Sequence, residues 1–160
     1  MSQRYVIVHD ENKCIGCQAC SVACRSENNV PDGVSRLQVH IQGPFGEAPN
    51  LHFKYHRMSC QQCENAPCVT VCPTGAAYIG DDGIVSIKPE KCVGCMYCVA
   101  ACLYKVRFMN PETKVADKCN FCKDTRLARG EQPACVDVCP TDALVFGDTN
   151  DNNSQVAKML

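Results

Sequence analysis

Sixteen cysteines are the chemically distinctive residues of this 160-residue chain, and they fall into four groups of four. One group has the spacing Cys-x2-Cys-x2-Cys-x3-Cys and consists of Cys92, Cys95, Cys98 and Cys102. Thiolates at this spacing bind iron–sulfur clusters, the first three reaching one cluster and the fourth pointing to its neighbour. Soft thiolates also suit the iron of such clusters. This group therefore predicts 4Fe-4S clusters.

The other three groups have related spacings. They are Cys14, Cys17, Cys20 and Cys24; Cys60, Cys63, Cys68 and Cys72; and Cys119, Cys122, Cys135 and Cys139. Gly16 and Gly94 occupy the same position in two groups, where a missing side chain lets the backbone lie close to an inorganic cluster. Pro73 and Pro140 follow the last cysteine of two groups. Every cysteine belongs to a group, so none is left for another role.

Zinc and disulfide bonds are the alternatives to iron–sulfur clusters. Zinc sites take four ligands, often as two Cys-x2-Cys pairs, whereas three of these groups offer three cysteines to one centre. Cysteines three positions apart on tight loops bridge poorly, and no secretory signal is expected from the sequence. No Cys-x2-Cys pair is followed by His, which excludes haem attachment. The histidines lie in strand-like segments and are interpreted as surface or packing residues: His9, His40, His52 and His56.

The composition agrees with a small scaffold held together by metal sites. Cysteine accounts for 16 of 160 residues, and there is no Trp. A formal net charge of −1, with the charges interspersed, excludes nucleic acid as an expected partner. No combination of acid, base and nucleophile is evident. The chain is therefore expected to have no catalytic residues and not to be an enzyme by itself.

Short strands are predicted to connect the cysteine groups. The alternating or β-branched segments are residues 4–9, 37–41, 53–58, 76–79, 84–87 and 143–146. A turn is expected at 81–83, between two of these strands. The Gly- and Pro-containing residues 43–50 are predicted to form a loop.

Helical structure is predicted to be short. Residues 21–25 are expected to form a helical turn, and residues 124–129 a helix that Gly130 ends. The polar residues 148–153 predict a mobile tail, so that the last residues become ordered only by a partner.

The spacing of the groups predicts the domain organisation. The gap from Cys72 to Cys92 is close to that between the halves of a two-cluster ferredoxin, so residues 60–102 are interpreted as one complete module. The first and fourth groups must then complete each other, although Cys24 and Cys119 are far apart in the chain. The expected fold is α+β: two nested ferredoxin-like modules, each binding two 4Fe-4S clusters, with short strands, short helices and many loops. Its domains are an outer module of residues 1–59 and 103–160 and an inserted module of residues 60–102.

Several stretches carry a resemblance to a known family. They are residues 14–20, Val30-Pro31-Asp32-Gly33, residues 63–68 and residues 116–122. With its four groups in this order, the chain resembles the iron–sulfur (B) subunits of the molybdopterin oxidoreductase (dimethyl sulfoxide reductase) family. It looks most like the electron-transfer subunit of thiosulfate or polysulfide reductase. Many relatives have Pro where this chain has Leu103, which removes a fixed backbone angle there.

The resemblance implies how the cysteines are shared among four 4Fe-4S clusters. Cluster 1 is held by Cys14, Cys17, Cys20 and Cys139; cluster 2 by Cys24, Cys119, Cys122 and Cys135; cluster 3 by Cys60, Cys63, Cys68 and Cys102; and cluster 4 by Cys72, Cys92, Cys95 and Cys98. In each set the iron ligands come from two different groups.

The resemblance also implies a place in a larger complex. Electrons are expected to pass between a membrane subunit that oxidises quinol and a molybdopterin catalytic subunit that reduces thiosulfate, polysulfide or a related acceptor. The sequence shows no pattern typical of a signal peptide or a transmembrane segment, so neither is expected. The chain is therefore expected to associate with the membrane through a partner, on the periplasmic face, after export as a passenger. A free multi-cluster carrier and a zinc-binding structural module are the alternatives.

Overall fold

The computed structural model describes residues 3–160; Met1 and Ser2, the first residues of the expected outer module, lie outside it. The strands are β1 (Tyr5–His9), β2 (Leu37–Phe45), β3 (His52–Ser59), β4 (Ala77–Ile79), β5 (Val85–Ile87), β6 (Phe108–Met109), β7 (Ala116–Asp117) and β8 (Leu144–Asp148). The helices are α1 (Ala19–Asn28), α2 (Pro67–Thr70), α3 (Tyr97–Ala101), α4 (Ala134–Asp137) and α5 (Gln155–Met159). Two 3₁₀ turns span Pro89–Lys91 and Leu127–Arg129. The fold is thus a small mixed α and β structure built from short elements.

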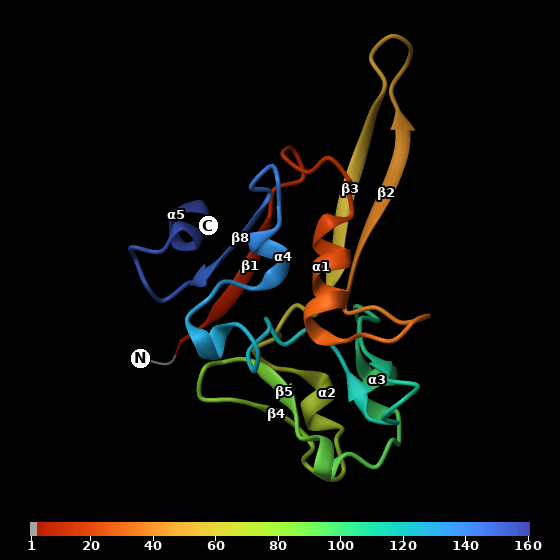
Figure 1. Cartoon of the computed structure of the whole chain (residues 1–160), viewed down its shortest axis with the longest axis vertical. Helices are drawn as coiled ribbons and strands as arrows, with labels where there is room; N and C mark the ends of the chain where they lie inside the picture. Colours follow the sequence, from red (N-terminus) through yellow and green to blue (C-terminus); the bar gives the residue numbers. More distant parts are fainter. Residues whose placement is uncertain (1–2) are drawn as a thin grey trace.

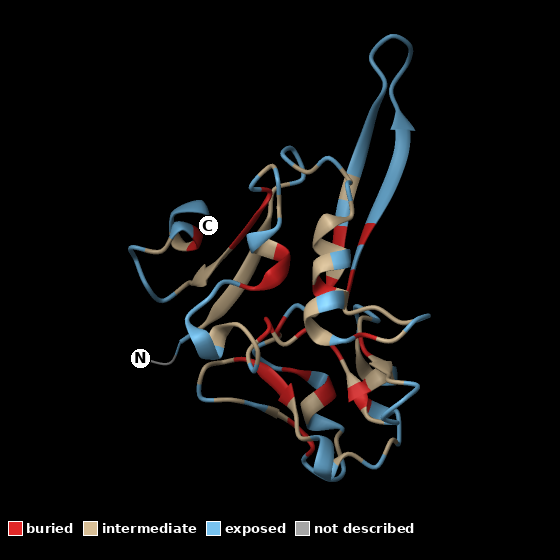
Figure 2. Ribbon diagram, viewed as in Figure 1, coloured by how far each residue is buried: buried red, intermediate tan, exposed pale blue. Residues whose placement is uncertain are grey.

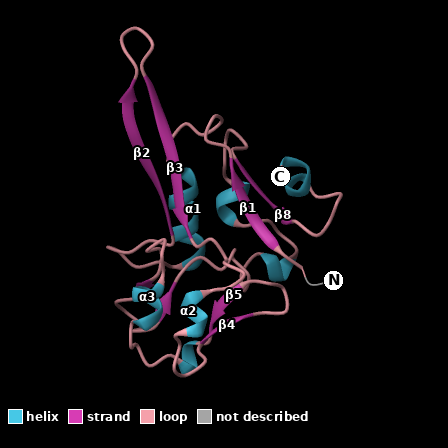
Figure 3. Ribbon diagram, turned by 180° about the vertical axis from the view of Figure 1, so that it is seen from behind, coloured by secondary structure: helices cyan, strands magenta, loops and turns pink. Residues whose placement is uncertain are grey.

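Four two-stranded antiparallel pairs make up the sheet structure of residues 3–160. β1 pairs with β8 from opposite ends of the chain, with Tyr5 opposite Asp148 and His9 opposite Leu144. β4 pairs with β5 across a tight turn. β2–β3 and β6–β7 are the other two pairs. Viewed from behind, β1 and β8 again lie side by side (Figure 3), so the two termini of the fold meet in one sheet.

The elements separate into two parts along the long axis of the molecule (Figure 1). β1, β8, α1 and α4 lie in the upper part, and α2, β4, β5 and α3 lie in the lower part. In each part a strand leads into a ligand loop and helix: β1 precedes α1, and β5 precedes α3. In each part another short helix is followed by the partner strand: α4 by β8, and α2 by β4. The two parts therefore repeat one arrangement.

Many of the buried apolar residues form three small clusters, and each of these clusters contains cysteines. The lower cluster includes Cys68, Val85, Cys98 and Ala116. Buried segments lie in both the upper and the lower part of the molecule, whereas the far end of the β2–β3 hairpin is exposed (Figure 2). An apolar core split this way buries little surface per cluster, so the metal sites must contribute to holding the fold together.

Most predicted strands are confirmed to within a few residues, because alternating and β-branched residues decide them locally. The predicted loop at 43–50 is wrong at its start, since β2 continues through Gly43 to Phe45. The pairing register shifts between Gln42 and Phe45, and this irregularity accommodates the Gly-Pro pair within the strand.

The helices are longer or shorter than predicted. The turn expected at 21–25 is part of a ten-residue helix, α1. The helix expected at 124–129 is only a 3₁₀ turn, Leu127–Arg129, although Gly130 ends it as expected with a φ of 73°.

The expectation of a mobile tail after residue 148 is wrong for the last residues. Ser154 caps α5 by accepting a hydrogen bond from the Ala157 backbone N–H at 3.1 Å. Val156 is fully buried, and its side chain packs against Gly147 of β8. This apolar contact holds the helix within the chain's own fold.

Candidate metal centres

The cysteines gather around four cavities, each lined by four of them. Cavity 1 is lined by Cys14, Cys17, Cys20 and Cys139; cavity 2 by Cys24, Cys119, Cys122 and Cys135; cavity 3 by Cys60, Cys63, Cys68 and Cys102; and cavity 4 by Cys72, Cys92, Cys95 and Cys98. Among residues 3–160, none of the sixteen forms a disulfide bond. Each cavity thus brings together cysteines from two groups that are separated in sequence.

The thiols of each set surround a space instead of meeting at a point. Within residues 3–160, no group of three or more His, Cys, Asp or Glu side chains is close enough to hold a single metal ion. Apolar atoms fill much of the remaining lining; Val39 and Leu144 line cavity 1, and Ala66 and Val85 line cavity 3. A set of thiolates around an apolar space suits a polynuclear cluster, whose iron and sulfide atoms occupy the centre.

Four short helices connect the cavities in pairs through cysteines four positions apart. In α1, Cys20 lines cavity 1 and Cys24 lines cavity 2. The same spacing recurs at the other helices, in Cys68 and Cys72, Cys98 and Cys102, and Cys135 and Cys139. Within α1, positions i and i+4 are neighbours one turn apart, so this helix presents its two cysteines to adjacent cavities. At α2, α3 and α4 the second cysteine lies just beyond the end of the helix and lines the other cavity of the pair. Cavities 1 and 2 form one pair, and cavities 3 and 4 the other.

The Cys-x2-Cys loops share an unusual backbone conformation. The residue before the second cysteine has a positive φ in all four groups: 68° at Gly16, 49° at Gln62, 70° at Gly94 and 57° at Phe121. Loops that place residues in the left-handed region turn successive N–H groups toward one side, which creates a concave site for an anion. The loops are therefore shaped to surround a negatively charged cluster.

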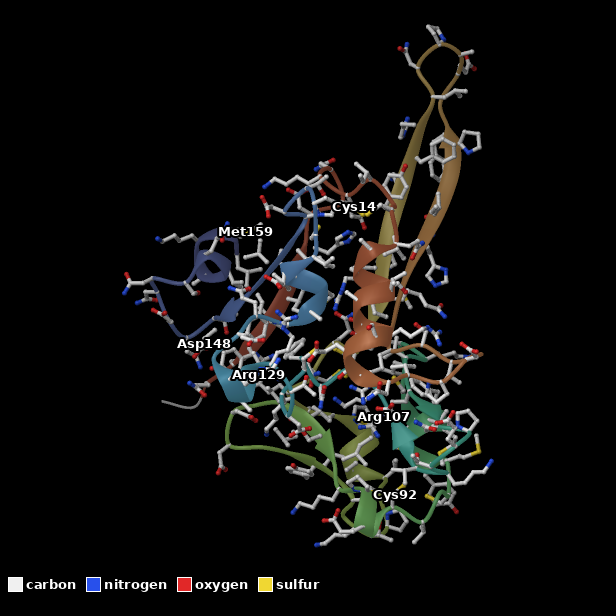
Figure 4. All side chains as sticks on the ribbon, viewed as in Figure 1. Cys14, Cys92, Arg107, Arg129, Asp148 and Met159 are labelled. Carbon is white, nitrogen blue, oxygen red and sulfur yellow. The ribbon has the colours of Figure 1, made fainter. Side chains whose placement is uncertain are left out.

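The two cavity pairs meet in the middle of the molecule. Cys119 of cavity 2 is buried in the same apolar cluster against which Cys60 of cavity 3 packs. Cys14 and Cys92 lie at opposite ends of the body below the hairpin (Figure 4). The four cavities consequently run in the order 1, 2, 3, 4, and Cys17 and Cys95 are exposed at the two ends.

Burial controls the acidity of the thiols deep in the fold. It raises the pKa of the Cys24 thiol, and the neighbouring Cys119 and Cys135 act in the same direction. Burial also raises the pKa of Cys135 to about 12, although the Arg57 guanidinium opposes this shift. Thiols with raised pKa values stay protonated at neutral pH, so iron must displace protons when it binds there.

Two equivalent thiols near the cavity mouths are more acidic. The Ala77 backbone N–H donates to Cys72 Sγ at 3.4 Å and lowers the pKa of that thiol to about 7. Burial acts to raise the pKa of Cys139, but hydrogen bonds from the backbone of Thr141 and Ala143 lower it overall. These N–H groups stabilise a thiolate at the same place in both repeats.

Polar side chains around cavity 2 orient its surroundings. Asn28 Nδ2 donates to Cys122 Sγ at 3.6 Å, and its Oδ1 accepts a hydrogen bond from Arg36 Nη1 at 2.9 Å. Arg36 in turn forms an ion pair with Asp117 at 2.8 Å. This series of contacts fixes a donor next to a ligating sulfur, as outer partners commonly do in metal sites.

Three buried cations near the cavities were not expected from the sequence. Arg57 lies in β3, Arg107 comes just before β6, and Lys118 directly precedes Cys119. Lys118 is 2% exposed, and its Nζ donates to the backbone oxygens of Val85 and Cys119. No motif marks these residues, because Lys and Arg are common in polar segments and only the tertiary structure reveals their burial.

Leu103, the residue that departs from the family pattern, lines cavity 3 and is 83% exposed. It therefore lies at the rim of that cavity, with most of its side chain exposed.

Comparison with known proteins agrees with the cysteine sites. Residues 51–149 match a family described as a 4Fe-4S dicluster domain, and residues 13–76 match a second family with the same description. The B subunit of polysulfide reductase from Wolinella succinogenes is 63% identical over 162 residues, covering 100% of this chain and 84% of the relative. The thiosulfate reductase electron transfer subunit PhsB of Salmonella typhi is 58% identical, and the match covers 97% of this chain and 81% of the relative. Protein NrfC of Escherichia coli is 54% identical, and the match covers 98% of this chain and 71% of the relative.

The fold and the sites therefore define a 4Fe-4S dicluster protein. Within that class, the protein belongs to the iron–sulfur (B) subunits of the molybdopterin oxidoreductase family. As an electron-transfer subunit it is not catalytic by itself. No helix among residues 3–160 is both long and apolar enough to cross a membrane.

Proposed function

We propose that this chain carries electrons through four 4Fe-4S clusters, one in each cavity. The observation that carries the proposal is the lining of the cavities, four cysteines to each, with every cysteine used once. The proposed ligand sets are those that line cavities 1 to 4. When bound, such clusters accept and release single electrons. The chain's own part is to supply the thiolates, exclude water with apolar lining residues and keep neighbouring cavities close together.

The proposed organisation is two nested ferredoxin-like modules. Residues 60–102 form the inserted module, and residues 1–59 and 103–160 form the outer one. Pairing of β1 with β8 and of β4 with β5 supports this division, because each pair joins the two halves of one repeat. Met109 and Ala116 pack in the core of the inserted module, so residues just after 102 also contribute to it.

We further propose that the chain works between two partners. The names of its relatives support a complex that reduces polysulfide, thiosulfate or a related acceptor. In this arrangement a membrane subunit oxidises quinol, and a molybdopterin subunit reduces the acceptor. The family pattern directs the outer module toward the catalytic subunit and the inserted module toward the membrane. The proposed location is the periplasmic face of the membrane, reached by export together with a partner.

Isolation of the native complex tests this function. The tagged chain, expressed in its native host, is purified in mild detergent, and its partners are identified by mass spectrometry. We expect a molybdopterin subunit, an apolar membrane subunit and oxidation of the chain's reduced clusters when thiosulfate or polysulfide is added. A chain that purifies alone, and whose reduced clusters respond to neither compound, would favour a free carrier. Zinc in place of iron and acid-labile sulfide would overturn the electron-transfer function.

A further inference from the structure

Each pair of cavities contains one arginine that lines both of its members. Arg57 lines cavities 1 and 2, and Arg107 lines cavities 3 and 4. We call these two residues the junction arginines. They come from different places in the chain, Arg57 from β3 and Arg107 from the segment before β6. Equivalent positions in the two pairs are therefore filled by a cation of the same kind.

Both junction arginines are buried, and most of their guanidinium nitrogens have no hydrogen-bond partner among residues 3–160. Arg57 is 9% exposed and Arg107 is 4% exposed. Within residues 3–160, Nε and Nη2 of Arg57 and all three guanidinium nitrogens of Arg107 have no hydrogen-bond acceptor. A guanidinium stays charged in proteins and has only donors. A buried charge with unused donors is strongly unfavourable unless a further group accepts them.

The remaining arginines differ in having a carboxylate partner, and this includes Arg126, whose buried Nε also lacks a hydrogen bond within residues 3–160. Each of them forms an ion pair with a carboxylate: Arg4, Arg25, Arg36, Arg126 and Arg129. A negatively charged acceptor inside the cavities that they line would satisfy the charge and the donors of the junction arginines. Under the proposed function, a 4Fe-4S cluster with its thiolates is such an anion, and its sulfur atoms accept hydrogen bonds.

We propose that Arg57 and Arg107 donate hydrogen bonds to the sulfur atoms of the two clusters beside each of them, and so raise the reduction potentials of both clusters. The inference rests on the proposed function, because it needs clusters in the cavities. Reduction adds one electron to an already negative cluster and breaks no bond. A fixed positive charge with aimed donors therefore stabilises the reduced form more than the oxidised form.

The junction between cavities 2 and 3 differs from these two. Lys118 lies there, but its ammonium group already donates to the Val85 and Cys119 backbone oxygens and contacts Gln62 Oε1 at 3.4 Å. It has protein acceptors for its hydrogens, whereas the junction arginines do not within residues 3–160. Hydrogen bonding to cluster sulfur is thus assigned only within the two pairs.

The test uses the full chain loaded anaerobically with iron and sulfide, with metal and sulfide content measured first. Arg57→Gln and Arg107→Gln remove the charge, and Arg129→Gln at an exposed ion pair is the matched control. Redox titrations followed by electron paramagnetic resonance give the potential of each cluster, with signals assigned through Cys14→Ser and Cys92→Ser. For Arg57→Gln we expect the reduction equilibrium constants of clusters 1 and 2 to fall about tenfold, which is 59 mV for one electron. Arg107→Gln should instead lower the reduction equilibrium constants of clusters 3 and 4. The control variant should leave the constants of all four clusters unchanged.

Arg57→Lys and Arg107→Lys keep the charge but lose the forked donor geometry. We expect these variants to recover part of the lost potential. If a Gln variant fails to hold its clusters, the Lys variant tests whether the junction arginine sets the reduction potentials. Unchanged potentials in fully loaded Lys and Gln variants, or equal shifts in all four clusters, would overturn the inference. Failure of the unaltered chain to bind iron and sulfide would instead refute the proposed function.

Discussion

At the scale of single residues, the fourth cysteine of each group lines a different cavity from the other three cysteines of that group. Cys20 and Cys24 differ by one helical turn, yet they line different cavities. Cys139 completes the lining of cavity 1 from the other end of the chain. The role of a cysteine therefore depends on where its helix directs the side chain, and two substitutions make this testable.

We expect Cys24→Ser to disturb the cluster of Cys119, Cys122 and Cys135 and to leave that of its own group intact. The hydroxyl is a harder ligand than the thiolate and binds this iron poorly. Electron paramagnetic resonance of the loaded variant should show cluster 2 lost or shifted.

Cys139→Ser is the reciprocal substitution to Cys24→Ser, and it should disturb only cluster 1. If Cys24→Ser changed only the cluster held by Cys14, Cys17 and Cys20, four independent local sites would describe the protein better than shared ligands.

Gly16 requires the absence of a side chain for two separate reasons. Its φ is +68°, and a Cβ there would lie 2.4 Å from the Tyr55 ring. We expect Gly16→Ala to lower the free energy of unfolding of the loaded chain by more than the roughly 1–2 kcal/mol that the left-handed conformation alone costs. Guanidinium denaturation followed by cluster absorbance measures this loss.

Gly130→Ala isolates the backbone cost, since Gly130 has a φ of +73° and nothing within 4 Å of the added Cβ. The free energy of unfolding of this variant should fall by no more than about 1–2 kcal/mol. Equal losses in the two variants would show that Tyr55 moves aside without cost.

At the scale of elements, the short helices provide the spacing between cavities and the strand pairs close each repeat. β1 and β8 come from opposite ends of the chain, and α5 covers β8 through Val156. A C-terminal helix in this position stabilises the pairing that brings Cys14 and Cys139 into the same cavity.

We expect Val156→Ala to reduce the stability of the loaded chain by about 1–3 kcal/mol, because it removes fully buried methyl groups and leaves a cavity. Leu160→Ala, at a side chain that is 80% exposed, is the control and should change stability little. Thermal unfolding of the two variants provides the comparison. A Val156 variant as stable as the control would mean that α5 adds nothing to the fold.

At the scale of the whole molecule, much of the apolar burial is divided among three small groups of residues that contain cysteines. Without metal these groups surround cavities, and the junction arginines have no acceptors within residues 3–160. Binding of iron–sulfur clusters would fill the cavities and give the junction arginines acceptors, so cluster binding is coupled to folding.

We therefore expect the chain prepared without iron and sulfide to unfold without a cooperative transition, and the loaded chain to unfold sharply. Differential scanning calorimetry and amide proton dispersion measure the two states. Anaerobic addition of iron and sulfide to the metal-free chain should restore the transition. A metal-free form with native-like dispersion would contradict this coupling.

The sequence by itself determined the chemistry of this protein, because ligand type and short spacing are local properties. Cys92, Cys95 and Cys98 indicate 4Fe-4S ligation without any structure, and β-branched runs identify most strands. Only the tertiary structure decided which distant elements meet: β1 with β8, Tyr55 against Gly16, and α5 on β8. It also decided that Arg57 and Arg107 are buried between cavities, since burial depends on packing between segments that sequence patterns do not relate.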